Sequence, residues 1–162
     1  MYFANMSIAE VITYLKTNID QTDITLNSGA SSSLIAKFEN TFNVRLPNDI
    51  KQFYEFSNGF ESAEDDFRIV PIEEMLDESL SMNYTEINIA EYLIYCDIWN
   101  LEINTEDHNL YHITNVGSDN KKVVLTTSFA ELIQRFLKGG VFEPGGLYRW
   151  LEEINDNDVS SQ

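Results

Sequence analysis

The sequence predicts a single α+β domain in which a mainly antiparallel (mixed) sheet is flanked by N- and C-terminal helices. Apolar residues recur at helical spacing in the first and last thirds of the chain. Between them lie short alternating or continuous apolar runs that end at turn residues, as strands do. The length of 162 residues suits one domain with its own core. We expect this domain at residues 1–155 and a polar tail at residues 156–162.

Two amphipathic helices are predicted at the N-terminal end. Four apolar residues of the first helix share one face: Ile8, Val11, Ile12 and Leu15. Ser7, with Glu10 three residues later, has the pattern of a capping box, so this helix starts near Ser7. The polar stretch 17–31 is expected to form a loop. A second helix is predicted from residue 32 or 33 to about residue 42, after serines that are good N-caps.

A short third helix is predicted just after Pro47. The proline ring presets the backbone for helix entry, and Asn48 or Asp49 is expected to cap the helix. Phe53 lies on its apolar face. The pair Asn58-Gly59 ends it, because Gly59 can adopt the left-handed conformation that a sharp helix exit requires.

The middle of the chain is predicted to form most of the sheet. An acidic loop at residues 61–66 precedes a strand at 67–72 and a short helix at 73–80. The apolar run 92–99 is expected to be a buried central strand, which would bury the thiol of Cys96. Further strands are expected at 101–104, 110–114 and 122–127. Two amphipathic helices follow, at residues 129–137 and 147–154.

The acidic residues are concentrated in the middle third of the chain. The whole sequence has 27 acids against 10 lysines and arginines, a formal net charge of −17. Residues 55–107 contain fifteen of these acids and a single base, Arg68. Acidity that is spread evenly serves solubility, whereas acidity gathered in one segment predicts a negative face on the folded domain.

The composition also restricts the partners and the compartment. A pI near 4.2 argues against nucleic acid and an anionic membrane as partners, because both require a basic surface. It permits a basic protein partner. A single cysteine excludes an internal disulfide and fits a reducing compartment. No secretory signal and no membrane-spanning run is evident. We therefore expect a cytoplasmic protein without a cofactor.

Residues suited to catalysis or metal binding form no recognisable motif. His108 and His112 have the i, i+4 spacing that binds zinc on a helix. Their local pattern predicts a strand or hairpin instead, which would place them roughly 13 Å apart. The run 64–66 lacks the spacing of a calcium loop, and the carboxylates are too numerous to single out a catalytic pair. The sequence therefore predicts a non-enzymatic protein with no metal site.

The segment 46–59 resembles the signature of the SUKH superfamily, which includes yeast cell-wall (glucan) synthesis regulators and many bacterial immunity proteins. The matching positions are Leu46, Pro47, Asp49, Phe53, Asn58 and Gly59. The family usually continues with a second glycine, where this chain has Phe60. Segments 68–75, 92–97 and 128–133 are similar to its strand-into-helix step, core strand and late helix. The resemblance covers about residues 30–138.

The resemblance implies an α+β fold, a protein-binding role and no catalytic residues. Our first hypothesis is an immunity-type protein that neutralises a basic toxin, for example a nuclease, through an acidic face. The second is a regulatory or scaffold protein like the cell-wall regulators. The oligomeric state stays open. The candidate partner contacts are eleven acids of the middle segment: Glu61, Glu64, Asp65, Asp66, Glu73, Glu74, Asp77, Glu78, Glu102, Glu106 and Asp107.

Overall fold

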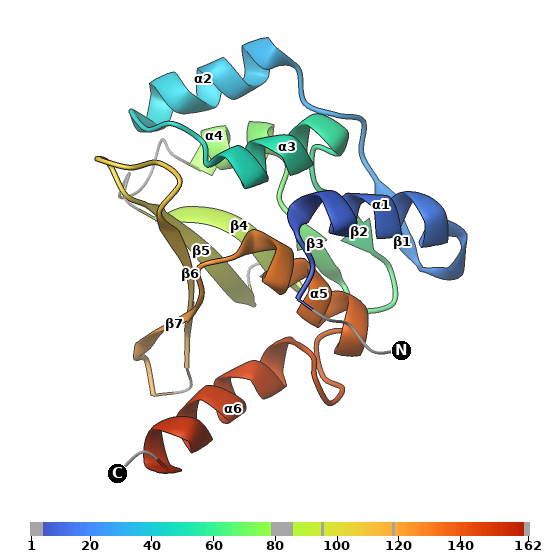
Figure 1. The fold of residues 1–162 in the computed structure, drawn as a ribbon, viewed down its shortest axis with the longest axis vertical. Coiled ribbons are helices and arrows are strands. Elements are labelled where there is room, and N and C mark those ends of the chain that lie inside the picture. The colour runs from blue at the N-terminus through green and yellow to red at the C-terminus, as the bar shows by residue number, and fades with distance from the viewer. Residues whose placement is uncertain (1–4, 79–85, 95, 118, 161–162) are drawn as a thin grey trace.

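The computed structural model describes residues 5–78, 86–94, 96–117 and 119–160, with side chains except those of residues 78 and 158–160. Within these ranges the chain forms a seven-stranded sheet in which every strand pairs antiparallel with the next along the sequence. Helices flank this meander, so the predicted α+β class is confirmed (Figure 1).

The helices and strands follow the chain in two sets. The helices are α1 (Ile8–Asn18), the 3-10 turn η1 (Ile19–Gln21), α2 (Ser32–Phe42), α3 (Asn48–Phe56), α4 (Ile72–Glu78), α5 (Phe129–Gly139) and α6 (Leu147–Ser160). The strands are β1 (Ile24–Leu26), β2 (Phe60–Ser62), β3 (Phe67–Ile69), β4 (Ile87–Tyr92), β5 (Asp97–Ile103), β6 (Tyr111–Val116) and β7 (Lys122–Thr126).

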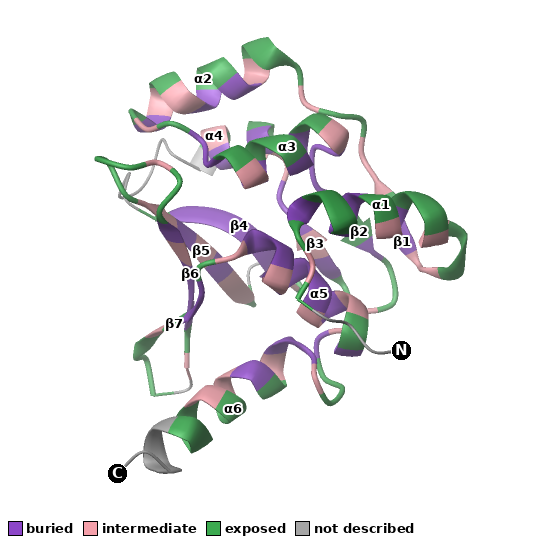
Figure 2. Cartoon of the chain, in the orientation of Figure 1, coloured by how far each residue is buried: buried purple, intermediate pink, exposed green. Residues whose placement is uncertain are grey.

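The core lies between one face of the sheet and a layer made by α1, α3 and α5, which contact one another. The ring of Phe67 on β3 stacks on Phe136 of α5 at 4.3 Å between centroids and meets Trp99 of β5 edge-on at 5.7 Å. Phe53 of α3 packs edge-on against Phe129 of α5. Figure 2 shows the result, with buried residues on the sheet and on the inner sides of these helices.

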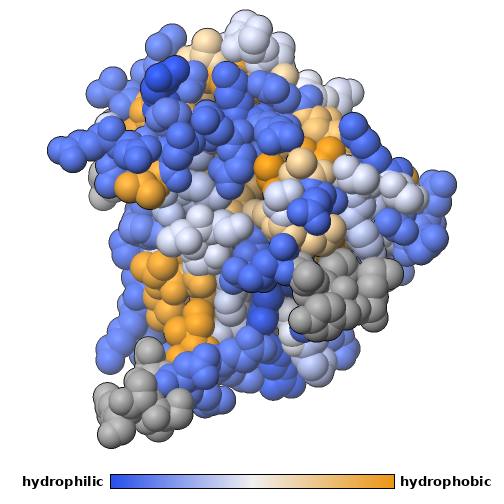
Figure 3. Space-filling model, in the orientation of Figure 1, coloured by the Kyte–Doolittle hydropathy of each residue, from blue (hydrophilic) through white to orange (hydrophobic). Residues whose placement is uncertain are grey.

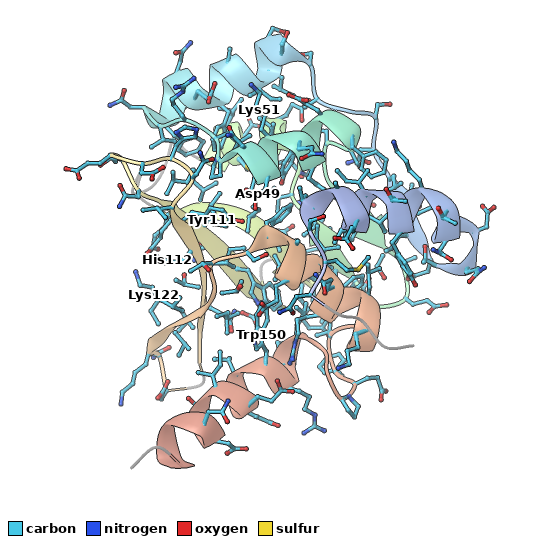
Figure 4. All side chains as sticks on the ribbon, viewed as in Figure 1. Asp49, Lys51, Tyr111, His112, Lys122 and Trp150 are labelled. Atoms are coloured by element: carbon cyan, nitrogen blue, oxygen red, sulfur yellow. The ribbon has the colours of Figure 1, made fainter. Side chains whose placement is uncertain are left out.

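The predicted entry to α3 is correct in position and wrong in its capping residue. Pro47 itself occupies the N-cap position and makes no side-chain cap hydrogen bond, while Asn109 accepts the backbone N–H of Asn48 at 3.0 Å and Asp49 accepts that of Ile50 at 2.8 Å. Asp49 has a second role, since its carboxylate also accepts a hydrogen bond from the hydroxyl of Tyr111 on β6. The same hydroxyl accepts the backbone N–H of Phe129 at 2.7 Å, at the start of α5. Figure 4 shows Asp49 and Tyr111 side by side, and they join α3, β6 and α5.

The pair Asn58-Gly59 forms a corner between α3 and β2. The Asn58 side chain accepts the backbone N–H of Ile72 at 2.9 Å and donates to Glu73 at 2.7 Å, which holds the start of α4. Gly59 has the predicted left-handed backbone, with φ +83°. A Cβ at this position would lie 2.3 Å from the carbonyl oxygen of Ile69, so only glycine fits.

The prediction of one buried central strand at 92–99 is correct only for residues 97–99, which begin the inner strand β5 and include the buried Trp99, and it is wrong for the residues before them. Strand β4 ends at Tyr92 and β5 begins at Asp97, and these two residues face each other across an antiparallel pair. The apolar run is therefore the tip of a hairpin, with Ile94 82% exposed. Cys96 is exposed as well, which corrects its predicted burial. Apolar composition alone does not distinguish such a tip from a core strand.

Several predicted loops are more ordered than expected. The stretch 17–31 contains the end of α1, the turn η1 and the strand β1. Asp23, just before β1, accepts hydrogen bonds from the Ser62 hydroxyl on β2 and from the Glu64 N–H, which hold β1 beside β2. The acidic loop at 61–66 is shorter than predicted, since β2 continues to Ser62.

Two predicted boundaries also differ. The strand predicted at 67–72 ends at Ile69, and α4 begins at Ile72. At the C-terminus, α6 runs to Ser160, into the segment expected to be a polar tail.

Replacing Tyr111 with phenylalanine tests the contact between α3, β6 and α5. Tyr111→Phe leaves the Phe129 N–H and the Asp49 carboxylate without this partner at a buried position. We expect the free energy of unfolding to fall by about 2 kcal/mol, which corresponds to roughly 4–8 °C in Tm. Urea denaturation measures the change. A loss below about 0.5 kcal/mol would show that this hydroxyl is not a structural link.

Candidate protein-binding surface

A row of three charged residues crosses the face of the sheet opposite the helix layer. Glu61 on β2 lies opposite Arg68 on β3, which lies opposite Glu91 on β4. Phe67 and Ile69, the neighbours of Arg68, are buried on the other face, as strand alternation requires. The row therefore alternates acid, base and acid on the side that α1, α3 and α5 leave open.

Arg68 is held by carboxylates on two sides. Its Nε donates to Glu91, which is only 1% exposed, and its Nη1 lies 2.7 Å from the carboxylate of Glu74 on α4. Burial alone would lower the pKa of Arg68, but the hydrogen bonds to Glu74 and Glu91 outweigh burial and raise it. Glu61 is more loosely placed, 4.0 Å from Nη1 and with its side chain 67% exposed.

A groove of about 520 Å³ runs along this row towards the tips of two hairpins. We call it the acidic groove, and its charged lining residues are Glu61, Asp66, Arg68, Glu74 and Glu91. Four carboxylates thus face one guanidinium. Leu93 and Ile94 at the tip between β4 and β5 complete the wall, and we call these two residues the apolar turn. The volume lies in the range typical of sites that take a side chain or small ligand.

The two hairpin tips are tied together. We call the tip between β2 and β3, residues 63–66, the acidic tip. The backbone N–H of Leu93 donates to the carbonyl of Asp66 at 2.9 Å, which fixes the apolar turn beside the acidic tip. Phe142, after α5, also lies close, because its ring packs on Tyr92 at 5.4 Å. Of these side chains, Leu93, Ile94 and Phe142 are exposed. Acidic and apolar side chains therefore share one end of the sheet.

Carboxylates crowd around Asp65 on the acidic tip. Partial burial raises the pKa of the Asp65 carboxyl above its ordinary value. Four neighbouring carboxylates raise it further, those of Asp23, Glu64, Asp66 and Glu143. The loop after α5 contributes Glu143 to this crowding and approaches closely, since a Cβ on Gly140 would lie 2.9 Å from the Asp65 carboxylate. The negative charges at this end of the sheet thus repel one another in the free protein.

The eleven predicted contact residues do not form one face. Five of them line the acidic groove or its tip: Glu61, Glu64, Asp65, Asp66 and Glu74. Glu73 accepts the hydrogen bond from Asn58, and Asp77 is exposed further along α4. Glu106 and Asp107 are exposed beyond the opposite end of β5, roughly 20 Å away at about 3.3 Å per residue. The side chain of Glu78 lies outside the described residues.

Glu102 is engaged in a separate cluster on β5. It pairs with His112 on β6 and with Lys122 on β7, which also reaches Glu86 at 3.2 Å. Partial burial on its own would raise the pKa of Glu102, but the hydrogen bonds from Lys122 and His112 outweigh it and lower the pKa. His108 belongs to a turn before β6. The described residues contain no group of three or more His, Cys, Asp or Glu that would hold a metal ion.

Neither the apolar turn nor Phe142 is predicted from the sequence as a surface feature. The signal that would have identified the turn is the four-residue gap between Tyr92 and Asp97, which suits a hairpin. A second exposed apolar area lies over β6 and β7, where Val116 of β6 and Val124 of β7 are exposed (Figure 3). There the register shifts between Ile113 and Thr114, an irregularity that protects edge strands from pairing with other chains.

Comparison with known proteins agrees with the sequence resemblance. The profile of the SMI1 / KNR4 family (SUKH-1) matches residues 29–136, which is more than half of the chain. The matched region includes the Asn58-Gly59 corner, both hairpin tips and the start of α5. No curated protein matches the chain. Within the described residues, no helix is long and apolar enough to cross a membrane.

The crowding around Asp65 predicts an unusual pH dependence. Its folded-state pKa is raised, so the repulsion is present at about pH 7 and is relieved as the pH falls through that pKa. Asp65→Asn should therefore raise Tm at about pH 7 by roughly 1–2 °C, a small gain because solvent screens the charges. The advantage should shrink as the pH falls through this raised pKa towards about pH 4, the ordinary pKa of an aspartate.

Thermal unfolding at both pH values measures the effect of Asp65→Asn. Asp156→Asn on α6, an exposed position far along the chain, is the matched control and should change Tm little at either pH. An Asp65→Asn variant that is no more stable than the parent at about pH 7, or equally favoured at both pH values, would contradict the proposed crowding.

Proposed function

Because the chain belongs to the SMI1/KNR4 family (SUKH-1), we propose that it is a non-enzymatic protein-binding domain of the immunity type. It acts in the cytoplasm and neutralises a basic toxin domain, with a nuclease as the favoured class. The acidic groove and the acidic tip at residues 63–66 form the contact surface. The observation that carries the proposal is the excess of four carboxylates over one guanidinium in a groove that the helix layer leaves open.

The chemistry of a nuclease supports this choice of partner. A surface that binds phosphates is basic, and an acidic protein competes for it by presenting carboxylates in place of phosphates. The net charge of −17 would also steer a basic partner towards the chain and raise the association rate. Repulsion among the carboxylates near Asp65 is relieved when a cationic group arrives, which favours the bound state.

Coexpression with the product of the neighbouring gene tests the proposal. The parent chain should restore growth to cells that express that toxin and should copurify with it. Neutralising three acids together, as Glu61→Gln, Glu64→Gln and Asp66→Asn, should weaken the complex at least about tenfold and lower the salt dependence of its affinity, because long-range attraction is lost.

The matched control neutralises Glu106 and Asp107, two exposed acids beyond the other end of β5. It should bind the toxin like the parent chain. If the parent chain fails to restore growth, or if both variants bind equally well, the proposal is overturned. A cell-wall phenotype on deletion, without any toxic neighbour, would instead support the regulatory role.

A further inference from the structure

We propose that the acidic groove receives an arginine or lysine side chain of the partner, while the apolar turn, Leu93 and Ile94, anchors an adjacent apolar side chain. The inference rests on the proposed protein-binding function and specifies which chemistry the partner presents. The occupant is therefore a partner segment in which a basic residue has an apolar neighbour.

Charge determines the class of side chain that fits the groove. Arg68 is already occupied by Glu91 and Glu74, which leaves Glu61 and Asp66 as exposed acceptors in the same groove. The 4.0 Å separation between Arg68 and Glu61 shows that Glu61 is not committed to the arginine. Glu61 and Asp66 are therefore available to a second cation while Arg68 keeps its contacts with Glu91 and Glu74. An anionic or neutral side chain would gain no comparable interaction there.

Backbone conformation singles out the apolar turn. Leu93 and Ile94 have φ of 48° and 44°, the left-handed region that a β-branched residue rarely adopts. This conformation is strained for leucine and isoleucine, and asparagine or glycine would fit the same turn with less strain. Ile94 is 82% exposed, so burial in the free chain does not offset this strain. Contact with an apolar group of the partner would bury Ile94 and offset the strain.

The apolar turn is also positioned for the contact. The hydrogen bond from the Leu93 N–H to the Asp66 carbonyl holds it against the acidic tip, so both parts of the surface move together. Leu93 and Ile94 line the same groove as Glu61 and Asp66. A partner residue pair of one basic and one apolar side chain therefore meets both parts at once, as a central anchor with a charged neighbour does in tight complexes.

Titration of the 15N-labelled protein with the peptide acetyl-Ala-Leu-Arg-Leu-Ala-amide tests this pairing by NMR. We expect saturable shifts at the amides of Glu61, Arg68 and Leu93. The same peptide with citrulline, which replaces the guanidinium by a neutral urea group, should bind at least about tenfold more weakly. The absence of saturable shifts, shifts confined to residues 104–110, or equal binding of both peptides would each overturn the inference.

A substitution in the turn separates binding from folding. Ile94→Gly should raise Tm, because glycine relieves the left-handed strain, and should weaken binding of the arginine peptide about tenfold. Leu110→Asn is the matched control, since Leu110 is an exposed leucine beyond the other end of the sheet, and it should leave peptide binding unchanged. Unchanged affinity in Ile94→Gly would contradict the anchor. Self-association that Ile94→Gly abolishes would identify the occupant as a second copy and overturn the inference.

The outcomes also separate this inference from the proposed function. If the chain restores growth against the toxin but binds no peptide in the groove, the immunity role is supported and this inference is overturned. If the chain binds the peptide through Glu61 and Ile94 but protects against no toxin, the groove's preference for a basic and apolar pair is supported and the immunity role is overturned.

Discussion

The corner at Asn58 and Gly59 is the constraint on which the rest of the structure depends. Asn58 satisfies the first N–H of α4, and Gly59 lets β2 approach the Ile69 carbonyl more closely than any side chain would permit. Together they set the register in which Phe60 faces Ile69 and Glu61 faces Arg68. A shift of one residue would turn Arg68 into the core. The acidic groove therefore follows from the same corner that defines the family signature.

The two faces of the sheet differ: one packs into the core, and the other carries the charged residues of the acidic groove. The helix-covered face is filled by stacked aromatic rings such as Phe67 and Phe136. On the other face one guanidinium is held by a buried carboxylate, Glu91, which orders the groove without neutralising it. Charge repulsion and left-handed backbone are both placed at the hairpin tips, near Asp65 and Ile94. Charge repulsion and backbone strain at an exposed site both destabilise the free protein, and such features are typical of surfaces adapted to a partner.

The sequence was sufficient to predict the helices, because their apolar spacing and caps are local signals. Ser7 with Glu10 marks the start of α1, and the structure has that capping box. Short strands were missed where pairing is long-range, as in β1, which is fixed by Asp23 and Ser62. The candidate site was predicted as a set of acidic residues, because the sequence does not show which of them the fold brings together. The apolar turn was misread as core, because hydrophobicity does not report exposure.

Hydrogen–deuterium exchange on the complex maps the interface on the unmodified chain and so tests whether the acidic groove is the binding surface. We expect new protection at residues 61–68 and 91–94 when the basic partner binds, and no change at residues 104–110. The side chains at the hairpin tips are exposed in the free chain, so protection there beyond the level of the free chain reports contact. Protection confined to residues 104–110 or to α2, with the tips still exchanging freely, would contradict the assignment of the acidic groove as the binding surface.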